Sequence, residues 1–97
     1  MIARDNIQTG QIAVKAEATQ LPSISSNLVK LKAASTNSGS VYIGSSAVAK
    51  PGGSANNTTA GFELAAGEET GWLPISNLHF LYMIGSDGDK LLYLSLI

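Results

Sequence analysis

The chain has 97 residues and a formal net charge of −1, and only 13% of its residues are charged. A chain of this length is expected to form one domain, and its 44% apolar residues are enough to fill a single core. The near-neutral charge provides no basic surface for nucleic acid. The sequence has no cysteine and one histidine, which excludes disulfides, thiolate zinc sites and multi-histidine metal sites. We therefore expect no cofactor and no metal, and no membrane-spanning segment because no apolar run approaches the necessary length.

The periodicity of the first half is typical of β-strands. Apolar and polar residues alternate over 12–18 and again over 28–34, which predicts two strands with one face each in the core. A third strand is predicted over 41–43, and the short connection favours its antiparallel pairing with 28–34. Residues 50–59 contain no apolar residue larger than alanine, so we expect a mobile surface loop there.

Two further strands are predicted in the middle of the second half. One covers residues 61–64 and the other residues 72–75. In the latter, Leu73 and Ile75 share one face, and Trp72 lies on the other. If the aliphatic face fills the core, Trp72 points outward.

The last twenty residues contain a strong turn signal, the Asp-Gly pair at 87–88, between the apolar segments 78–84 and 90–97. A two-residue turn there predicts a hairpin in which Tyr82 pairs with Tyr93. One face of this hairpin is then aliphatic and the other aromatic, and we expect the aliphatic face to fill the core. A one-residue slip in register would exchange the two faces. The aliphatic set is Leu81, Met83, Leu92, Leu94 and Leu96.

These patterns together predict an all-β fold. Strands of four to eight residues recur about every ten residues, as in antiparallel sandwiches and small barrels, and we expect about seven or eight of them. No segment shows a helical repeat with caps. Residues 1–10 would form an N-terminal arm, and residues 11–97 the single domain.

The residue types that carry catalysis are present, but the sequence does not bring them together. His79 lies between apolar neighbours, and no serine occupies a G-x-S-x-G elbow. Glu68 and Glu69 are adjacent, so on a strand they would point to opposite faces. Asp87 and Asp89 offer few of the six to eight oxygens that Ca²⁺ requires, and a turn already explains them. We therefore expect a protein that is not an enzyme.

Packing in the core is one interpretation of the aromatic residues, and the phase of the strands favours the other, an outward row. An outward aromatic row with few charges is typical of a protein contact surface. Such a row on a free monomer would promote aggregation, so we expect a permanent partner, most simply a second copy of the chain. The residues predicted to form this oligomer interface are Trp72, Phe80, Tyr82 and Tyr93.

Several short motifs occur in a recognisable order over residues 20–97. Together they resemble small β-sandwich structural proteins that tailed bacteriophages encode among their virion genes. The motifs are Leu21-Pro22-Ser23-Ile24, Val29-Lys30-Leu31-Lys32-Ala33, Val41-Tyr42-Ile43-Gly44, Gly61-Phe62-Glu63-Leu64, Leu73-Pro74-Ile75 and Leu81-Tyr82-Met83-Ile84-Gly85.

The resemblance implies an antiparallel, jelly-roll-like β-sandwich without enzymatic activity. For a short free-standing chain it implies a capsid decoration (cement) protein, often a homotrimer, that bridges copies of the major capsid protein on the virion surface. The protein would be made in the host cytoplasm. The N-terminal arm, with Ile2, Arg4 and Ile7, would then contact the capsid or a neighbouring copy, and a frayed terminus is the alternative.

The resemblance also leaves a second function open. Longer members of the group carry similar modules on head or tail fibres, where they would bind a receptor or a glycan. In that case Trp72 and the asparagine-rich loop at 50–59 would form a platform for a sugar.

Overall fold

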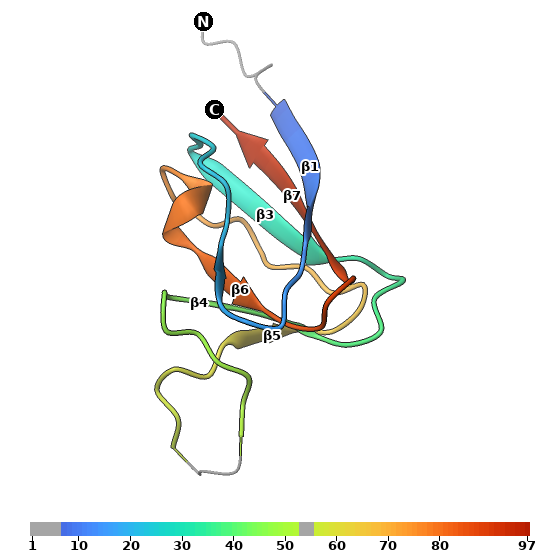
Figure 1. Cartoon of the computed structure of the whole chain (residues 1–97). Helices are drawn as coiled ribbons and strands as arrows, with labels where there is room; N and C mark the ends of the chain where they lie inside the picture. The colour runs from blue at the N-terminus through green and yellow to red at the C-terminus, as the bar shows by residue number, and fades with distance from the viewer. Residues whose placement is uncertain (1–6, 53–55) are drawn as a thin grey trace, which may run out of the picture.

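A computed structural model describes residues 7–52 and 56–97, whose strands form two antiparallel sheets (Figure 1). Sheet A has the strand order β1-β7-β3, and sheet B has the order β2-β6-β4-β5. A short 3₁₀ helix, η1 (Leu78–Phe80), leads into β6. The strand bounds are β1 (Ile7–Ala13), β2 (Thr19–Gln20), β3 (Leu28–Ala33), β4 (Val41–Gly44), β5 (Phe62–Leu64), β6 (Tyr82–Ile84) and β7 (Lys90–Leu96).

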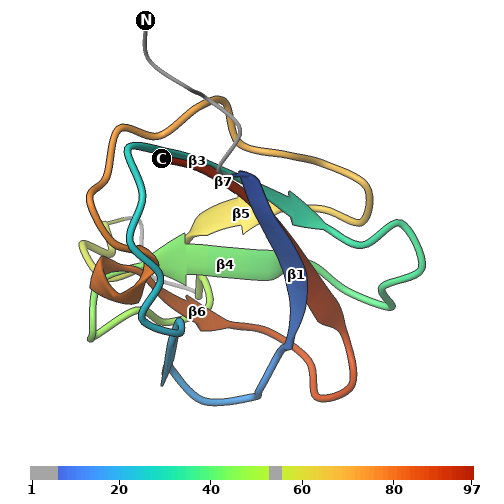
Figure 2. The same ribbon diagram turned by 90° about the horizontal axis from the view of Figure 1, so that it is seen from above.

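The core lies between the two sheets, whose inner faces contribute to one buried cluster (Figure 2). On β3 the side chains of Val29, Leu31 and Ala33 are fully buried. Lys30 and Lys32, which alternate with them, are only partly buried. The alternation predicted over 28–34 is thus confirmed. The other buried strand residues of this cluster are Val41, Ile43, Leu64, Met83 and Leu91.

The antiparallel pairing predicted between 28–34 and 41–43 is wrong. β3 pairs with β7, while β4 pairs with β5 and β6 in the other sheet. The connection between β3 and β4 therefore crosses from sheet A to sheet B. Both strands bury one apolar face, and placing them on opposite sides of the core lets these faces meet.

The first strand begins earlier than the alternation predicted. Residues 7–10 belong to β1 and pair with β7, so they are part of the sheet rather than of the arm expected over 1–10, whose first six residues lie outside the described ones. The strand expected over 12–18 ends near Val14, whose side chain is buried and whose N–H donates to the Asp89 carbonyl at 2.9 Å. From there the chain leaves sheet A and reaches β2 in sheet B.

The predicted C-terminal hairpin is also wrong, because β6 and β7 lie in different sheets. The turn itself is present: the Asp89 N–H donates to the Ser86 carbonyl at 3.2 Å, and Gly88 has a φ of 90°. Residues 78–80 form η1 in place of the expected strand start, and the Asn77 side chain caps it. Within the two described stretches, no helix has the length and apolar character needed to cross a membrane.

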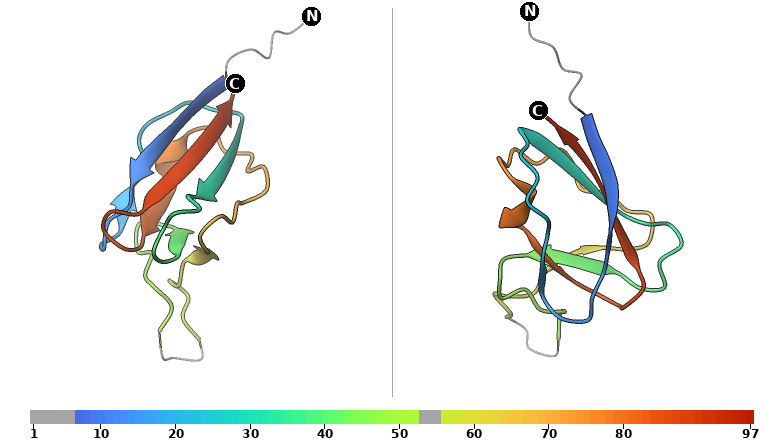
Figure 3. Two further views of the ribbon diagram at one scale, coloured as in Figure 1. Left: turned by 90° about the vertical axis from the view of Figure 1, so that its right-hand side faces the viewer. Right: turned by 45° about the horizontal axis from the view of Figure 1, so that its top comes forward.

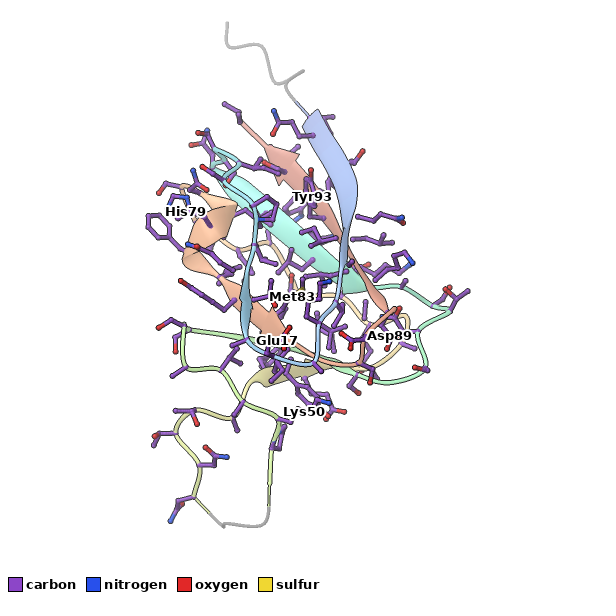
Figure 4. The ribbon with its side chains drawn as sticks, in the orientation of Figure 1. Glu17, Lys50, His79, Met83, Asp89 and Tyr93 are labelled. Atoms are coloured by element: carbon purple, nitrogen blue, oxygen red, sulfur yellow. The ribbon has the colours of Figure 1, made fainter. Side chains whose placement is uncertain are left out.

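Because β6 and β7 do not form a hairpin, β7 turns toward the core the face that was predicted to point outward. β6 has the orientation predicted for it. Met83 on β6 is fully buried, as expected of the aliphatic set (Figure 4). On β7, however, Leu91 and Ser95 are buried, whereas Leu92 and Leu94 lie on the outer face. The two faces of β7 are both apolar in sequence, so periodicity alone did not fix which one faces the core.

An irregular segment covers the outer edge of β3. Residues 69–77 run antiparallel to β3, and Leu73 exchanges two backbone hydrogen bonds of 2.7 and 2.9 Å with Val29. The Thr70 N–H donates to the Leu31 carbonyl at 2.8 Å, and the Thr70 Oγ1 accepts from the Leu31 N–H at 3.0 Å. This edge of sheet A is therefore closed by hydrogen bonds.

The connection between β4 and β5 projects away from both sheets (Figure 3). Ala49 closes its base, donating to the Thr59 carbonyl and accepting from the Gly61 N–H, both at 2.9 Å. Residues 53–55, part of the loop predicted to be mobile over 50–59, lie outside the described residues. The mobility of this loop stays a prediction.

Candidate functional site

Exposed apolar side chains are the main candidates for function in this structure. Single exposed apolar residues are ordinary on a protein surface, whereas several that gather on one face indicate a contact surface. Among the described residues, the large apolar ones that are exposed are Ile7, Leu28, Phe62, Trp72 and Phe80.

The outer face of sheet A carries an aliphatic row along its central strand. Leu92, Leu94 and Leu96 of β7 are partly exposed there. Ile7 of β1 and Leu28 of β3 flank Leu96 on either side, which places three large apolar residues abreast across the sheet. We call these five residues the outer row. The outer row is a continuous apolar strip on the protein surface, the kind of strip that we expected the aromatic residues to form.

Trp72 lies beside the outer face of β3 and is 42% exposed, which confirms its predicted outward position. The Lys30 Nζ lies 4.7 Å from the centroid of the indole ring and also forms a 3.2 Å ion pair with Glu69. A cation therefore covers one face of the ring. The strand predicted over 72–75 is reduced to the single bridge at Leu73.

The other three predicted interface residues do not join Trp72 in one row. Phe80 is 60% exposed on η1, with the His79 ring edge-on at a centroid distance of 4.6 Å. Tyr82 is half-buried on β6. Tyr93 was expected to point outward, but it packs against the core, because the register pairs it with Leu31 on the inner face.

An apolar cavity of about 380 Å³ opens beside Phe62, which is 69% exposed. Its walls come from β4, β5, the irregular segment along β3 and the end of η1, with Ile43, Leu73 and Leu81 among the lining residues. No local sequence pattern indicates this cavity, because its walls are far apart along the chain. An apolar side chain of a partner fits its chemistry.

The buried carboxylate of Asp89 fixes a loop. It accepts hydrogen bonds from the Ser38 N–H at 2.9 Å, the Ser38 hydroxyl at 3.1 Å and the Gly39 N–H at 3.0 Å. These bonds, led by the one from the Ser38 N–H, hold the pKa of Asp89 below its usual value. Asp87 instead accepts from the Ala16 N–H at 3.1 Å. The two carboxylates thus serve different loops rather than one cation.

The side chains considered for catalysis lie apart. The His79 Nδ1 is 3.4 Å from the Ser23 hydroxyl, on the opposite side of the molecule from Asp89 (Figure 4). Glu68 accepts from the Ala65 N–H at 2.8 Å within its own turn. In the part of the chain that the structure describes, no three histidine, aspartate or glutamate side chains gather as a metal site requires.

The residues predicted for the N-terminal arm are only partly described. Ile2 and Arg4 lie outside the described residues. Ile7 is the first residue of β1, is 56% exposed and belongs to the outer row. Its contact with a capsid or a neighbouring copy stays a prediction.

No family model, curated protein or solved structure matches the chain. The case for a function therefore depends on the motifs of the sequence and on the surfaces described above.

Proposed function

We propose that the chain is a non-enzymatic virion structural protein of a tailed bacteriophage, a decoration protein that binds the outer shell and stabilises neighbouring capsid subunits. The motif resemblance over residues 20–97 suggests this role. The structural observation that carries it is the exposed apolar surface, because a protein that cements a shell binds through contact area rather than through a pocket with catalytic groups. Its partners are further copies of the chain, in a homotrimer, and the major capsid protein.

The fold we propose is a jelly-roll-like β-sandwich, and the strand order supports it. With the segment 69–77 counted beside β3, sheet A has four members, as sheet B does. The chain passes back and forth between the sheets, and of the strands in the described residues only β4 and β5 are consecutive and pair directly. Eight strands in two such sheets is the pattern of a jelly roll.

Capsid binding tests the proposed function directly. The full chain is mixed with capsids assembled from the major capsid protein encoded in the same genome, and saturable co-sedimentation is expected. Phe62→Ser and Phe80→Ser remove exposed aromatic area without opening the core, so each should weaken binding by about tenfold, which corresponds to about 1.4 kcal/mol. Glu17→Ser, at another exposed position, is the control and should bind as the wild type does. Absence of wild-type binding would refute the proposal.

A glycan-binding module of a head or tail fibre is the second candidate, and the exposure of Trp72 favours it. A sugar would stack on the indole face that Lys30 leaves free. The loop over 50–59 adjoins the other sheet, so we expect it to take no part in such a platform. Because the chain has one tryptophan, quenching of its fluorescence by host polysaccharide is a specific test.

A further inference from the structure

The open edges of the two sheets differ in length. In sheet B the edge strands are β2 and β5, with two and three residues. In sheet A the irregular segment 69–77 closes the edge at β3. The opposite edge is β1, which has seven residues from Ile7 to Ala13. Among the described strands, β1 thus offers the longest unpaired backbone.

The hydrogen-bond pattern of β7 shows which groups of β1 face outward. Lys90 uses its N–H and C=O toward the β3 side, with Asn37 and Ala34 as partners. Bonding sides alternate along an antiparallel strand, so Leu91 and every second residue after it bond toward β1. Their partners on β1 are Gln8, Gly10 and Ile12. The intervening N–H and C=O groups therefore point away from the sheet; they belong to Ile7, Thr9, Gln11 and Ala13.

β1 lacks the features that normally protect an edge strand. Its sequence, Ile-Gln-Thr-Gly-Gln-Ile-Ala, contains no charged residue and no proline. Natural edge strands are blunted by lysine, proline, bulges or short length. Five of its seven residues have neither a large apolar side chain nor a charge that would interfere with an incoming backbone: Gln8, Thr9, Gly10, Gln11 and Ala13.

We propose that β1 pairs antiparallel with the β1 strand of a second copy, around a two-fold axis at Gly10. In this register Thr9 faces Gln11 of the second copy, and Ile7 faces its Ala13, so the outward N–H and C=O groups bond each other along the whole strand. The two copies then share one six-stranded sheet, in which each β1 has β7 on one side and the other β1 on its second side.

A second copy fits this edge better than a charged partner strand. The two-fold axis at Gly10 brings residues next to it, such as Thr9 and Gln11, diagonally close to their own counterparts, so a charge at these positions would lie near a like charge. β1 carries none. The outer row also runs to this edge through Ile7, so the pairing brings the apolar faces of two sheets side by side.

Gly10 suits the position on the axis. Residues that face each other without hydrogen bonds in an antiparallel pair bring their Cα atoms to about 4.5 Å. The Tyr93 ring already fills the space above Gly10, because a Cβ there would lie 2.7 Å from the Tyr93 Oη. A side chain at this position would therefore have to displace the Tyr93 ring on the inner face.

This pairing is independent of capsid binding and is tested on the isolated full chain. Two-fold pairing gives a dimer, or a dimer of trimers if a trimer forms through another surface. We therefore expect an even multiple of 10.0 kDa by light scattering coupled to size exclusion, at concentrations up to about 1 mM. A monomer or a trimer throughout that range would overturn the proposal.

Gln11→Pro removes one outward donor without touching the ladder to β7, so the mass should fall to half. Gln11→Lys adds the charge that edge strands normally carry and should also halve the mass, which keeps the test valid if the proline variant does not fold. Gln11→Ser retains the backbone donor and is the control. An even mass that all three variants retain would show that another surface mediates the association.

Hydrogen exchange is a second measurement, and it shows whether β1 is the strand that forms the interface. In the wild type the amides of Thr9, Gln11 and Ala13 should be protected, as are those of Gln8 and the other residues bonded to β7. In the Gln11→Lys variant the outward amides should exchange at least about tenfold faster, with the inward ones unchanged. Outward amides that exchange freely in the wild-type assembly would overturn the proposal.

Discussion

Alanine substitution of two adjacent leucines on β7 tests the inner face of sheet A most sharply. Leu91 is fully buried in the core, whereas Leu92 lies partly exposed on the outer face. Leu91→Ala removes buried methyl groups and leaves a cavity, so we expect a loss of about 3 kcal/mol in the free energy of unfolding. Leu92→Ala removes the same atoms from a half-exposed site and should cost about 1 kcal/mol or less.

The measurement is thermal and urea unfolding followed by far-ultraviolet circular dichroism, at low protein concentration so that self-association does not contribute. For a domain of this size, 3 kcal/mol corresponds to a fall in Tm of roughly 12 °C or more. Each variant serves as the control for the other, because the chemistry of the substitution is the same. Equal losses, or a larger loss for Leu92→Ala, would mean that β7 presents its other face to the core.

Three further predictions concern contacts that hold loops and strands together. Because the pKa of Asp89 is lowered in the folded state, its contribution to stability is complete above the usual aspartate pKa and is lost as the pH falls from about 5 through the folded value. Asp89→Asn should flatten this acid-side decrease in Tm. Gly10→Ala should cost about 1–3 kcal/mol in urea unfolding by crowding Tyr93, and less in a Tyr93→Ala background. Thr70→Val leaves the buried Leu31 N–H without its acceptor and should cost about 1–3 kcal/mol in the same assay, whereas Thr70→Ser should be nearly neutral.

The sequence predicted single strands better than their partners. β3 was predicted well because lysines alternate with buried apolar residues, which leaves one choice of inner face. β7 offers no such contrast, since leucines occupy both faces. Ser95 adds to the difficulty: it is fully buried, and its Oγ makes no hydrogen bond within the described residues. Ser95 is thus a polar residue in the core, whereas the sequence pattern predicts it on the surface.

The Asp-Gly turn shows why correct local signals gave a wrong topology. Asp87 and Gly88 do form a tight turn, as their propensities predict. A turn fixes the direction of the chain over four residues, but the strands that follow it choose partners by the apolar faces available across the whole fold. Here β6 and β7 each insert between strands of a different sheet.

The sequence predicted an exposed apolar contact surface, but only some of the residues that form it. Trp72 and Phe80 are exposed as expected, because apolar residues near them in the chain, Leu73 and Leu78, supply the contacts to the core. Tyr93 is not, because its position depended on the hairpin. The cavity beside Phe62 and the cover over β3 arise from contacts between distant segments, which a local pattern cannot report.

The position of β7 at the centre of sheet A also has a consequence for synthesis of the protein. β1 and β3 do not pair with each other; both pair with β7, and the register joins Ile7 to Leu96. Until β7 is translated, β1 therefore has no partner in sheet A, and β3 can pair only with the irregular segment 69–77. Such distant pairings make folding slow, and the waiting strands are open to aggregation. A nascent chain arrested before Lys90 should remain dependent on a chaperone, and completion of β7 should release it.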